Sequence, residues 1–118
     1  MTLLYVEDNE DVRKTMTKIL SRYDCRLLVA SNGQEALEVI GEEDIDLLLT
    51  DYHMPKMNGK DLADILKERF PDLEVLIISA YQADDIGDYE FWVKPLNVSK
   101  FRRRIKKFKE DCKQKADL

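Results

Sequence analysis

Polar residues suited to metal and phosphate chemistry follow directly after four short apolar runs of the sequence. Glu7 and Asp8 come after "TLLYV", Asp51 closes "IDLLLTD", Ser79 closes "LEVLIIS" and Lys94 follows "YEFWV". If these runs are parallel strands of one sheet, their carboxyl ends share an edge, and the polar side chains would meet there. Because burying an unpaired carboxylate is costly, Asp51 is expected at a strand end that a cleft reaches.

Three carboxylates in one cleft repel one another unless a pKa rises or a divalent cation neutralises them. Oxygen donors without clustered histidine or cysteine favour Mg²⁺, with Mn²⁺ as the second candidate, over zinc. Because protein-bound Mg²⁺ is usually held by one or two carboxylates together with phosphate oxygens, the pattern indicates phosphate chemistry. A carboxylate can act as the nucleophile toward phosphorus, while a metal, a lysine and a hydroxyl stabilise charge on the phosphoryl oxygens.

Each of these residues also has an ordinary structural explanation when it is taken alone. An acidic pair after a strand often caps the next helix, and a serine that closes a strand often bonds to nearby backbone. A Lys-Pro pair commonly opens a loop. The joint placement at successive strand ends is what favours a functional site.

The elements expected to position these residues alternate between strands and helices. Apolar runs predict strands over 2–6, 25–30, 45–51, 73–79 and 89–93, and helical periodicity predicts helices over 10–23, 32–43, 59–70 and 97–112. The apolar residues expected to face the core from the last two helices are Leu62, Ile65, Leu66, Phe101, Ile105, Phe108 and Cys112. The alternation predicts an α/β fold, a doubly wound parallel sheet of five strands with helices on both faces.

The composition is that of one globular domain spanning residues 1–118, with 110–118 as a candidate tail or linker start. Hydrophobic residues make up 44% and charged residues 36%, a balance that supports a packed core and argues against disorder. The sequence shows no signal peptide and no apolar stretch of roughly 18 residues. A cytoplasmic location without membrane contact is therefore expected.

Positive charge is concentrated near the end of a chain whose net charge is −5. The run "KFRRRIKKFK", residues 100–109, holds seven cations and no anion. Such a run could contact nucleic acid or an acidic partner, but the simpler interpretation is a solvated helix face lying against an acidic body. Nucleic-acid binding through this domain is therefore not the favoured prediction.

Four segments together resemble the receiver domain of two-component response regulators. They are "VED" after the first strand, "LLLTDYHMPKMNG" around the third, "IIS" closing the fourth and "FWVKPL" around the fifth. The resemblance runs through all 118 residues, and the second segment is the most specific, because Met-Pro and then Met-Asn-Gly follow the aspartate. It implies a flavodoxin-like sheet with the strand order 2-1-3-4-5.

The resemblance also implies roles for the residues around the acidic cluster. Asp51 would be the phosphoacceptor. Glu7 and Asp8 would hold Mg²⁺ together with Asp51 and the backbone carbonyl of His53. In the family, the residues two positions after the phosphoacceptor and two after the switch hydroxyl flank the path of the hydrolytic water, so His53 and Tyr81 are expected to tune the lifetime of the phosphoryl group.

A second set of residues would respond to phosphorylation. By the resemblance, Ser79 would be the hydroxyl that turns toward the phosphoryl group, and Lys94 the cation that pairs with it. The Lys94–Pro95 peptide bond would be cis, and Phe91 would be the switch aromatic. Because phosphorylation adds about −1.5 to −2 charge and three strong acceptors, it would draw Ser79 inward, let Phe91 rotate and shift a pre-existing population.

The sequence departs from the family between the expected fourth and fifth strands, where the family usually has a helix. About nine residues, "AYQADDIGD", remain for this connection once the fifth strand is counted, whereas a parallel crossover normally needs a dozen or more. We therefore expect the family's fourth helix to be missing or vestigial, which puts the family's usual dimerisation and output face in doubt. The residues expected to cover the gap or meet a partner are Tyr81, Ile86, Tyr89 and Trp92.

The favoured function is that of a phosphoacceptor receiver domain in a phosphorelay. A histidine kinase or histidine phosphotransfer protein would donate the phosphoryl group, and an output domain or a second copy of the chain would read the phosphorylated state. The domain would catalyse its own phosphorylation and slow dephosphorylation, but it would serve as a signalling domain and not as an enzyme.

Two alternatives remain open. One is a receiver-like interaction module that no longer uses phosphate, against which the complete set of acids, serine and lysine argues. The other is a small Mg²⁺-dependent phosphohydrolase with an aspartate nucleophile. The dehalogenase-like pattern of such enzymes places a second aspartate two residues after the first, where this chain has His53.

Overall fold

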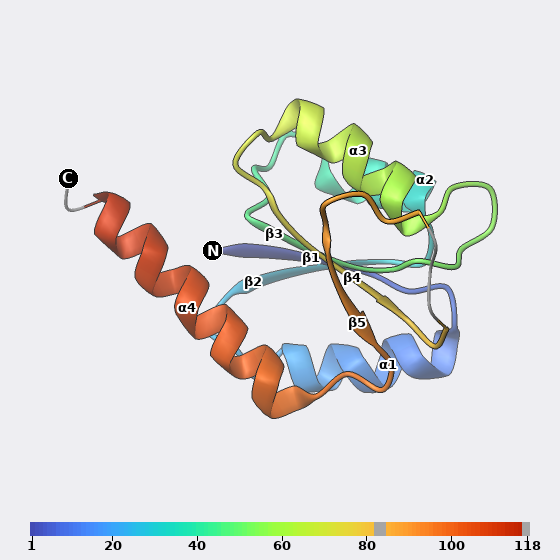
Figure 1. Ribbon diagram of the computed structural model, residues 1–118, viewed down its shortest axis with the longest axis horizontal. Coiled ribbons are helices and arrows are strands. Elements are labelled where there is room, and N and C mark those ends of the chain that lie inside the picture. Colours follow the sequence, from blue (N-terminus) through green and yellow to red (C-terminus); the bar gives the residue numbers. More distant parts are fainter. Residues whose placement is uncertain (82–84, 117–118) are drawn as a thin grey trace.

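The computed structural model contains a five-stranded parallel sheet in the order β2-β1-β3-β4-β5 between two layers of helices (Figure 1). The strands are β1 (Thr2–Val6), β2 (Arg26–Ala30), β3 (Leu47–Asp51), β4 (Glu74–Ser79) and β5 (Glu90–Val93). The helices are α1 (Glu10–Leu20), α2 (Gly33–Ile40), α3 (Gly59–Arg69) and α4 (Val98–Ala116). The structure describes the backbone of residues 1–81 and 85–116, with side chains as far as residue 108. The predicted fold class and strand order are confirmed.

The sheet is covered on both faces, which explains why its central strands are almost continuously apolar. All five residues of β3 are buried, and so are four of the five in β1. Alternate side chains point to opposite layers: Leu4, Leu48 and Ile77 pack toward α2 and α3, and Leu3, Leu49 and Ile78 pack toward α1 and α4. Both faces of the sheet are thus packed, and the packed strands position the residues at its carboxyl edge.

Every helix in the described part of the chain begins at an asparagine whose side chain accepts a backbone N–H. The caps are Asn9 to Val12 (3.0 Å), Asn32 to Glu35 (2.7 Å), Asn58 to Asp61 (2.8 Å) and Asn97 to Lys100 (2.9 Å). Such caps typically contribute about 0.5–2 kcal/mol each. Because each cap follows a strand, the caps fix where the loops at the carboxyl edge of the sheet end.

The connection between β4 and β5 contains no helix within its described residues, 80–81 and 85–89, and the molecule's fourth helix, α4, follows β5 instead. Residues 82–84 of the predicted short connection lie outside the described residues. Ile86 and Tyr89 pack against the apolar cluster on the α2–α3 side, and the Tyr89 hydroxyl donates a hydrogen bond of 2.6 Å to Asp64 on α3. These two residues therefore cover the gap. Trp92 is buried on the opposite face, and Tyr81 stays 73% exposed.

The last helix, α4, packs on the α1 side of the sheet and runs toward the edge where β1 begins (Figure 1). It buries Phe101, Ile105 and Phe108, as predicted, whereas the side chain of Cys112 lies outside the described residues. Within the described part of the chain, none of the helices is both long and apolar enough to cross a bilayer.

The prediction that Ile65 faces the core is wrong. Its side chain is 42% exposed, while Leu62, Ala63 and Leu66 face the sheet. The apolar positions at 62, 65 and 66 form a stripe wider than the contact that α3 makes, so the outermost member is left at the surface.

Candidate functional site

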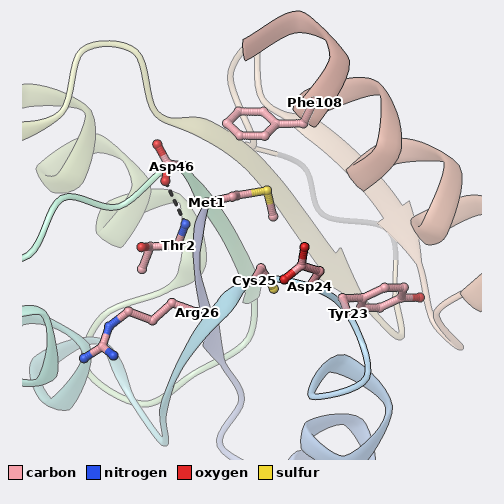
Figure 2. Close-up of a pocket in the computed structure, with 8 residues that line it drawn as sticks. All are labelled: Met1, Thr2, Tyr23, Asp24, Cys25, Arg26, Asp46 and Phe108. Carbon is pink, nitrogen blue, oxygen red and sulfur yellow. Dashed lines mark hydrogen bonds between the residues drawn. The ribbon is translucent and has the colours of Figure 1, made fainter. Parts of the chain in front are cut away.

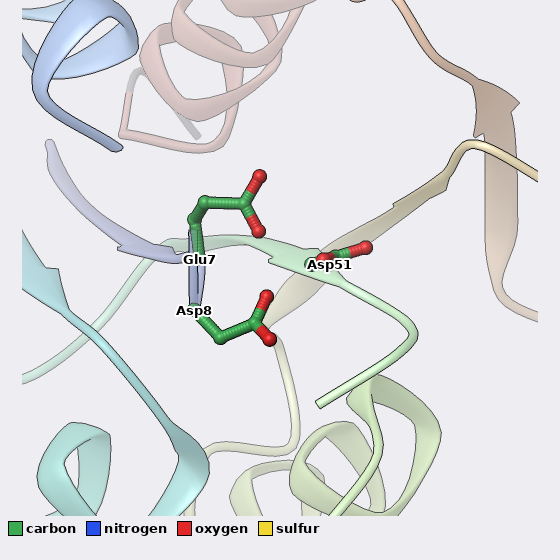
Figure 3. Close-up of side chains that lie close together, drawn as sticks. All are labelled: Glu7, Asp8 and Asp51. Carbon is green, nitrogen blue, oxygen red and sulfur yellow. The ribbon is translucent and has the colours of Figure 1, made fainter. Parts of the chain in front are cut away.

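The three acidic residues meet at the carboxyl edge of the sheet, as predicted. Glu7 and Asp8 follow the end of β1, and Asp51 is the last residue of β3. One carboxylate oxygen of each lies within 4.8 Å of the others, and Figure 3 shows the three side chains converging on one space. Glu7 and Asp51 are buried, whereas Asp8 is exposed, so the cluster opens to solvent on the Asp8 side.

Lys94 brings a positive charge to this cluster from the end of β5. Its Nζ donates to Glu7 Oε1 at 2.7 Å and lies 3.4 Å from Asp51 Oδ2. The backbone N–H of Lys94 donates to the carbonyl oxygen of Ser79 at 2.7 Å, which holds the residue against the end of β4. The Lys94–Pro95 bond is cis, as the family resemblance implies.

Burial and mutual repulsion divide the two inner carboxyls into one that ionises readily and one that does not. Burial, together with the neighbouring Glu7 carboxyl, raises the pKa of Asp51 to about 7. Burial also disfavours ionised Glu7, but its contact with Asp51 and the Lys94 ammonium hold the pKa of Glu7 below its ordinary value. The two carboxylates outweigh the effect of burial on Lys94 and raise its pKa, so the lysine remains a cation.

The arrangement fits a hard divalent cation. Glu7 Oε2 is buried and has no hydrogen-bond partner among the described residues, although a buried carboxylate oxygen normally has one. Glu7 forms one group with Asp8 and Asp51, and each of the three offers a carboxylate oxygen. Such a set matches Mg²⁺ or Mn²⁺ better than a metal that prefers nitrogen or sulfur ligands.

Two residues to which the sequence analysis gave no role hold the loops around the acids. A Cβ atom on Gly59 would lie 2.5 Å from the carbonyl oxygen of Asp51, so only glycine lets α3 start this close to β3. Arg13 of α1 donates to the carbonyl oxygen of Glu7 at 2.9 Å. The Asn-Gly pair at the start of the third helix signals the first of these roles, but no sequence signal marks Arg13.

The residues expected to switch or tune the site lie around its rim. Ser79 is buried, and its Oγ accepts the backbone N–H of Tyr81 at 3.1 Å. The exposed His53 ring makes edge contacts with Tyr52 (4.9 Å between centroids) and Tyr81 (5.9 Å). Phe91 is half-buried and packs on the α2–α3 side of the sheet. The structure therefore brings His53 and Tyr81 together beyond the ends of β3 and β4, and it places Phe91 on β5, the neighbour of β4.

Cavities lie both beside the acidic cluster and away from it, and one of about 470 Å³ is lined by Asp8 itself. Another, of about 530 Å³, lies beside Lys94, between α1 and the β5–α4 connection, and its lining is mostly apolar. A third, of about 700 Å³, lies where β1 and β2 begin and reaches Phe108 of α4 (Figure 2). Asp46, which lines the third cavity, accepts the backbone N–H of Thr2 at 2.7 Å. The third cavity is thus at the opposite edge of the sheet from the acids.

A parallel sheet in this order, with three carboxylates and a lysine at its carboxyl edge, defines a receiver-type α/β domain. Comparison with known proteins gives the family: the chain belongs to the response regulator receiver domains, whose family model matches residues 3–106. Members of this family are signalling domains of two-component response regulators.

Individual relatives differ in how much of them the chain covers. Response regulator protein PilR of Pseudomonas aeruginosa is 32% identical over 109 residues, which are 86% of this chain but 24% of PilR. Sporulation initiation phosphotransferase F of Bacillus subtilis is 25% identical, with 90% of this chain and 91% of that protein covered. The chain spans only 24% to 52% of the first four curated relatives.

A solved structure supports the same assignment. The CheX-CheY-BeF3-Mg+2 complex from Borrelia burgdorferi contains a chain with 27% identity and a TM-score of 0.75, with 89% of this chain and 86% of that one covered.

Proposed function

We propose that this domain receives a phosphoryl group on Asp51 from the phosphohistidine of a histidine kinase or a histidine phosphotransfer protein. The observation that carries the proposal is the cluster itself. Oxygens of Glu7, Asp8 and Asp51 lie within 4.8 Å of one another, and Lys94 Nζ lies 3.4 Å from Asp51 Oδ2. This geometry offers a nucleophile and a cation at one solvent-accessible point.

In the proposed transfer, a carboxylate oxygen of Asp51 forms a bond to phosphorus while the nitrogen–phosphorus bond of the donor breaks. The electron pair of that bond stays on the donor imidazole, and Asp51 becomes an acyl phosphate. Lys94 would then pair with a phosphoryl oxygen, and the hydroxyl of Ser79 would donate a hydrogen bond to another. Because Asp51 must be ionised to attack, its pKa of about 7 means that the metal-free site is only partly competent at neutral pH.

Glu7, Asp8, Asp51 and the backbone carbonyl of His53 would hold Mg²⁺, or Mn²⁺ in its place. A bound divalent ion supplies positive charge that favours ionised Asp51 and offsets charge on the phosphoryl oxygens. The buried and unsatisfied Glu7 Oε2 supports this proposal. So does the presence of Mg²⁺ in the related Borrelia complex.

The phosphoryl group would be read through the β4–β5 region. Ser79 would turn toward the phosphoryl group, the Tyr81 N–H would lose its acceptor, and Phe91 would rotate inward to fill the vacated space. Because Ile86 and Tyr89 cover the sheet here and the described residues of the connection contain no helix, output or dimerisation would use a surface different from the family's usual one. We place this signalling in the cytoplasm.

His53 and Tyr81 would tune how long the phosphoryl group lasts. Their ring centroids lie 5.9 Å apart beyond the ends of β3 and β4, where the two rings would restrict the approach of water. Tyr81→Ala should therefore shorten the lifetime of phosphorylated Asp51, measured by phosphate release. A longer lifetime in that variant would contradict this role.

The proposed function is tested by intact mass spectrometry after incubation with acetyl phosphate, with and without MgCl₂. Wild type should gain one phosphoryl group only with Mg²⁺, and Asp51→Asn should gain none. Asp72→Asn removes an exposed carboxylate elsewhere and should behave as wild type. No adduct and no Mg²⁺ binding would favour the interaction module, whereas continuous phosphate release without an adduct would favour the phosphohydrolase.

A further inference from the structure

The outer face of α4 carries positive charge that the rest of the domain does not use. Arg102, Arg103, Lys106 and Lys107 are all exposed, and none of them forms an ion pair within the described residues. Arg102 is a neighbour of Lys106 on the helix surface, and Arg103 is a neighbour of Lys107, because residues four apart lie side by side there. We call these four residues the α4 basic face.

Other cations of the same helix do contact the body. Arg104 donates to Glu90 at 3.0 Å and to Glu74 at 3.1 Å. Lys100 lies 4.2 Å over the Trp92 ring. The simple interpretation of the basic run was a helix face lying against an acidic body. Among the residues of the run whose side chains are described, it holds for Arg104 alone. The α4 basic face points the other way.

Neighbours along the sequence neutralise this face only in part. Glu110 and Asp111 follow Lys106 and Lys107 by one turn, but no acidic residue stands three or four positions from Arg102 or Arg103. The net charge of −5 opposes a polyanion only at long range, because charges farther apart than about 8 Å are screened at physiological salt. Two to four cations thus remain available to a partner.

The absence of exposed apolar side chains among the described residues of the α4 basic face distinguishes between possible anionic partners. Protein interfaces are usually anchored by buried aromatic or aliphatic side chains. The large hydrophobic residues exposed in the described part of the chain are Val12, Ile65, Tyr81 and Val93, and none of them lies on α4. A face with charge and no apolar anchor fits a phosphate backbone better than a protein surface, and it has no aromatic platform for unstacked bases.

We propose that the α4 basic face binds the phosphate backbone of duplex nucleic acid without reading its sequence. The α4 helix begins next to the phosphoacceptor edge and runs toward the opposite edge of the sheet, so this surface is separate from the proposed site on Asp51. Binding rests on ion pairs with phosphates and the release of counterions, and it weakens steeply with salt.

The test is fluorescence anisotropy of a labelled mixed-sequence DNA duplex titrated with the full chain at 50 to 200 mM NaCl. With two to four phosphate contacts, the affinity of wild type should fall between about 10-fold and 150-fold over this range. Arg102→Gln/Arg103→Gln should reduce the slope of log affinity against log salt by about 2. Because glutamine has a helix propensity close to that of arginine, this double variant is expected to fold.

Lys14→Gln/Lys18→Gln is the control matched in charge, because it removes two exposed cations from α1, one of them paired with Glu10, and gives the same net charge. This control should keep the wild-type slope. An equal reduction of this slope in the two double variants, or no duplex binding at 50 mM NaCl, overturns the proposal. Binding to poly-glutamate without binding to the duplex also overturns it, in favour of an acidic protein. A salt-sensitive dimer that Arg102→Gln/Arg103→Gln abolishes, without duplex binding, overturns it in favour of a second copy.

Discussion

Asp51→Asn should stabilise the metal-free protein at pH 8, although it removes the proposed phosphoacceptor. Asp51 is 6% exposed and has a pKa of about 7, compared with an ordinary value of 3.8. At pH values between 3.8 and about 7, the Asp51 carboxyl of the folded protein keeps a proton that the unfolded chain has lost. The free energy of unfolding of wild type therefore falls as the pH rises through this window, and asparagine removes this cost.

The size of the effect follows from the difference between the two pKa values. Each pKa unit corresponds to about 1.4 kcal/mol, so the ceiling is about 4 kcal/mol above pH 7. The variant also loses the 3.4 Å contact between Asp51 and Lys94, which offsets part of the gain. We expect a net gain of about 2 kcal/mol at pH 8, most of which disappears by pH 4.

The assay is urea unfolding in EDTA at pH values from 4 to 8, followed by the fluorescence of Trp92, the single tryptophan, which is buried. Asp72→Asn, at an exposed position, is the control and should change stability by less than about 0.5 kcal/mol. Added Mg²⁺ should stabilise wild type and not Asp51→Asn. A variant that is less stable than wild type at pH 8, or a difference independent of pH, would refute the reasoning.

Three further substitutions test the surroundings of the site by urea unfolding. Gly59→Ala should destabilise by about 2 kcal/mol or more, because its Cβ would lie 2.5 Å from the Asp51 carbonyl oxygen; wild-type stability would show that the loop yields. Lys56 has a φ of 69°, in the left-handed region that asparagine adopts more readily than lysine. Lys56→Asn should therefore stabilise the protein by about 0.5–1 kcal/mol. A lower free energy of unfolding in this variant would contradict the reasoning. Tyr89→Phe should cost about 1 kcal/mol, because it removes the hydrogen bond that the hydroxyl donates to Asp64. Burial, together with this bond, raises the pKa of Tyr89 to about 12. Unchanged stability would show that the bond does not fasten the connection.

The strands and the acidic cluster were predictable because both depend on patterns local to the chain. The run before Asp51 is apolar at nearly every position, which only a strand covered on both faces requires. Once the strands are parallel, the residues that follow them must gather at one edge. The short connection between β4 and β5, whose described residues contain no helix, was predictable from chain length alone.

Features that depend on which helix packs where could not be predicted in the same way. Ile65 fits the helical stripe of α3, but the width of the contact with the sheet decides that it is exposed. The bond from Arg13 to the Glu7 carbonyl depends on the packing angle of α1. Likewise, the sequence shows that Tyr89 is free to cover the gap, but its bond to Asp64 follows only from the path of the chain.

The position of the phosphoryl group is the most direct test of the central claim. The protein is incubated with acetyl phosphate and Mg²⁺ and then treated with borohydride, which reduces an acyl phosphate of aspartate to homoserine. Tandem mass spectrometry of the peptides should then find homoserine at residue 51 and unchanged aspartate at residue 8. Homoserine at another aspartate, or intact Asp51 in a protein that has gained a phosphoryl group, would contradict the account.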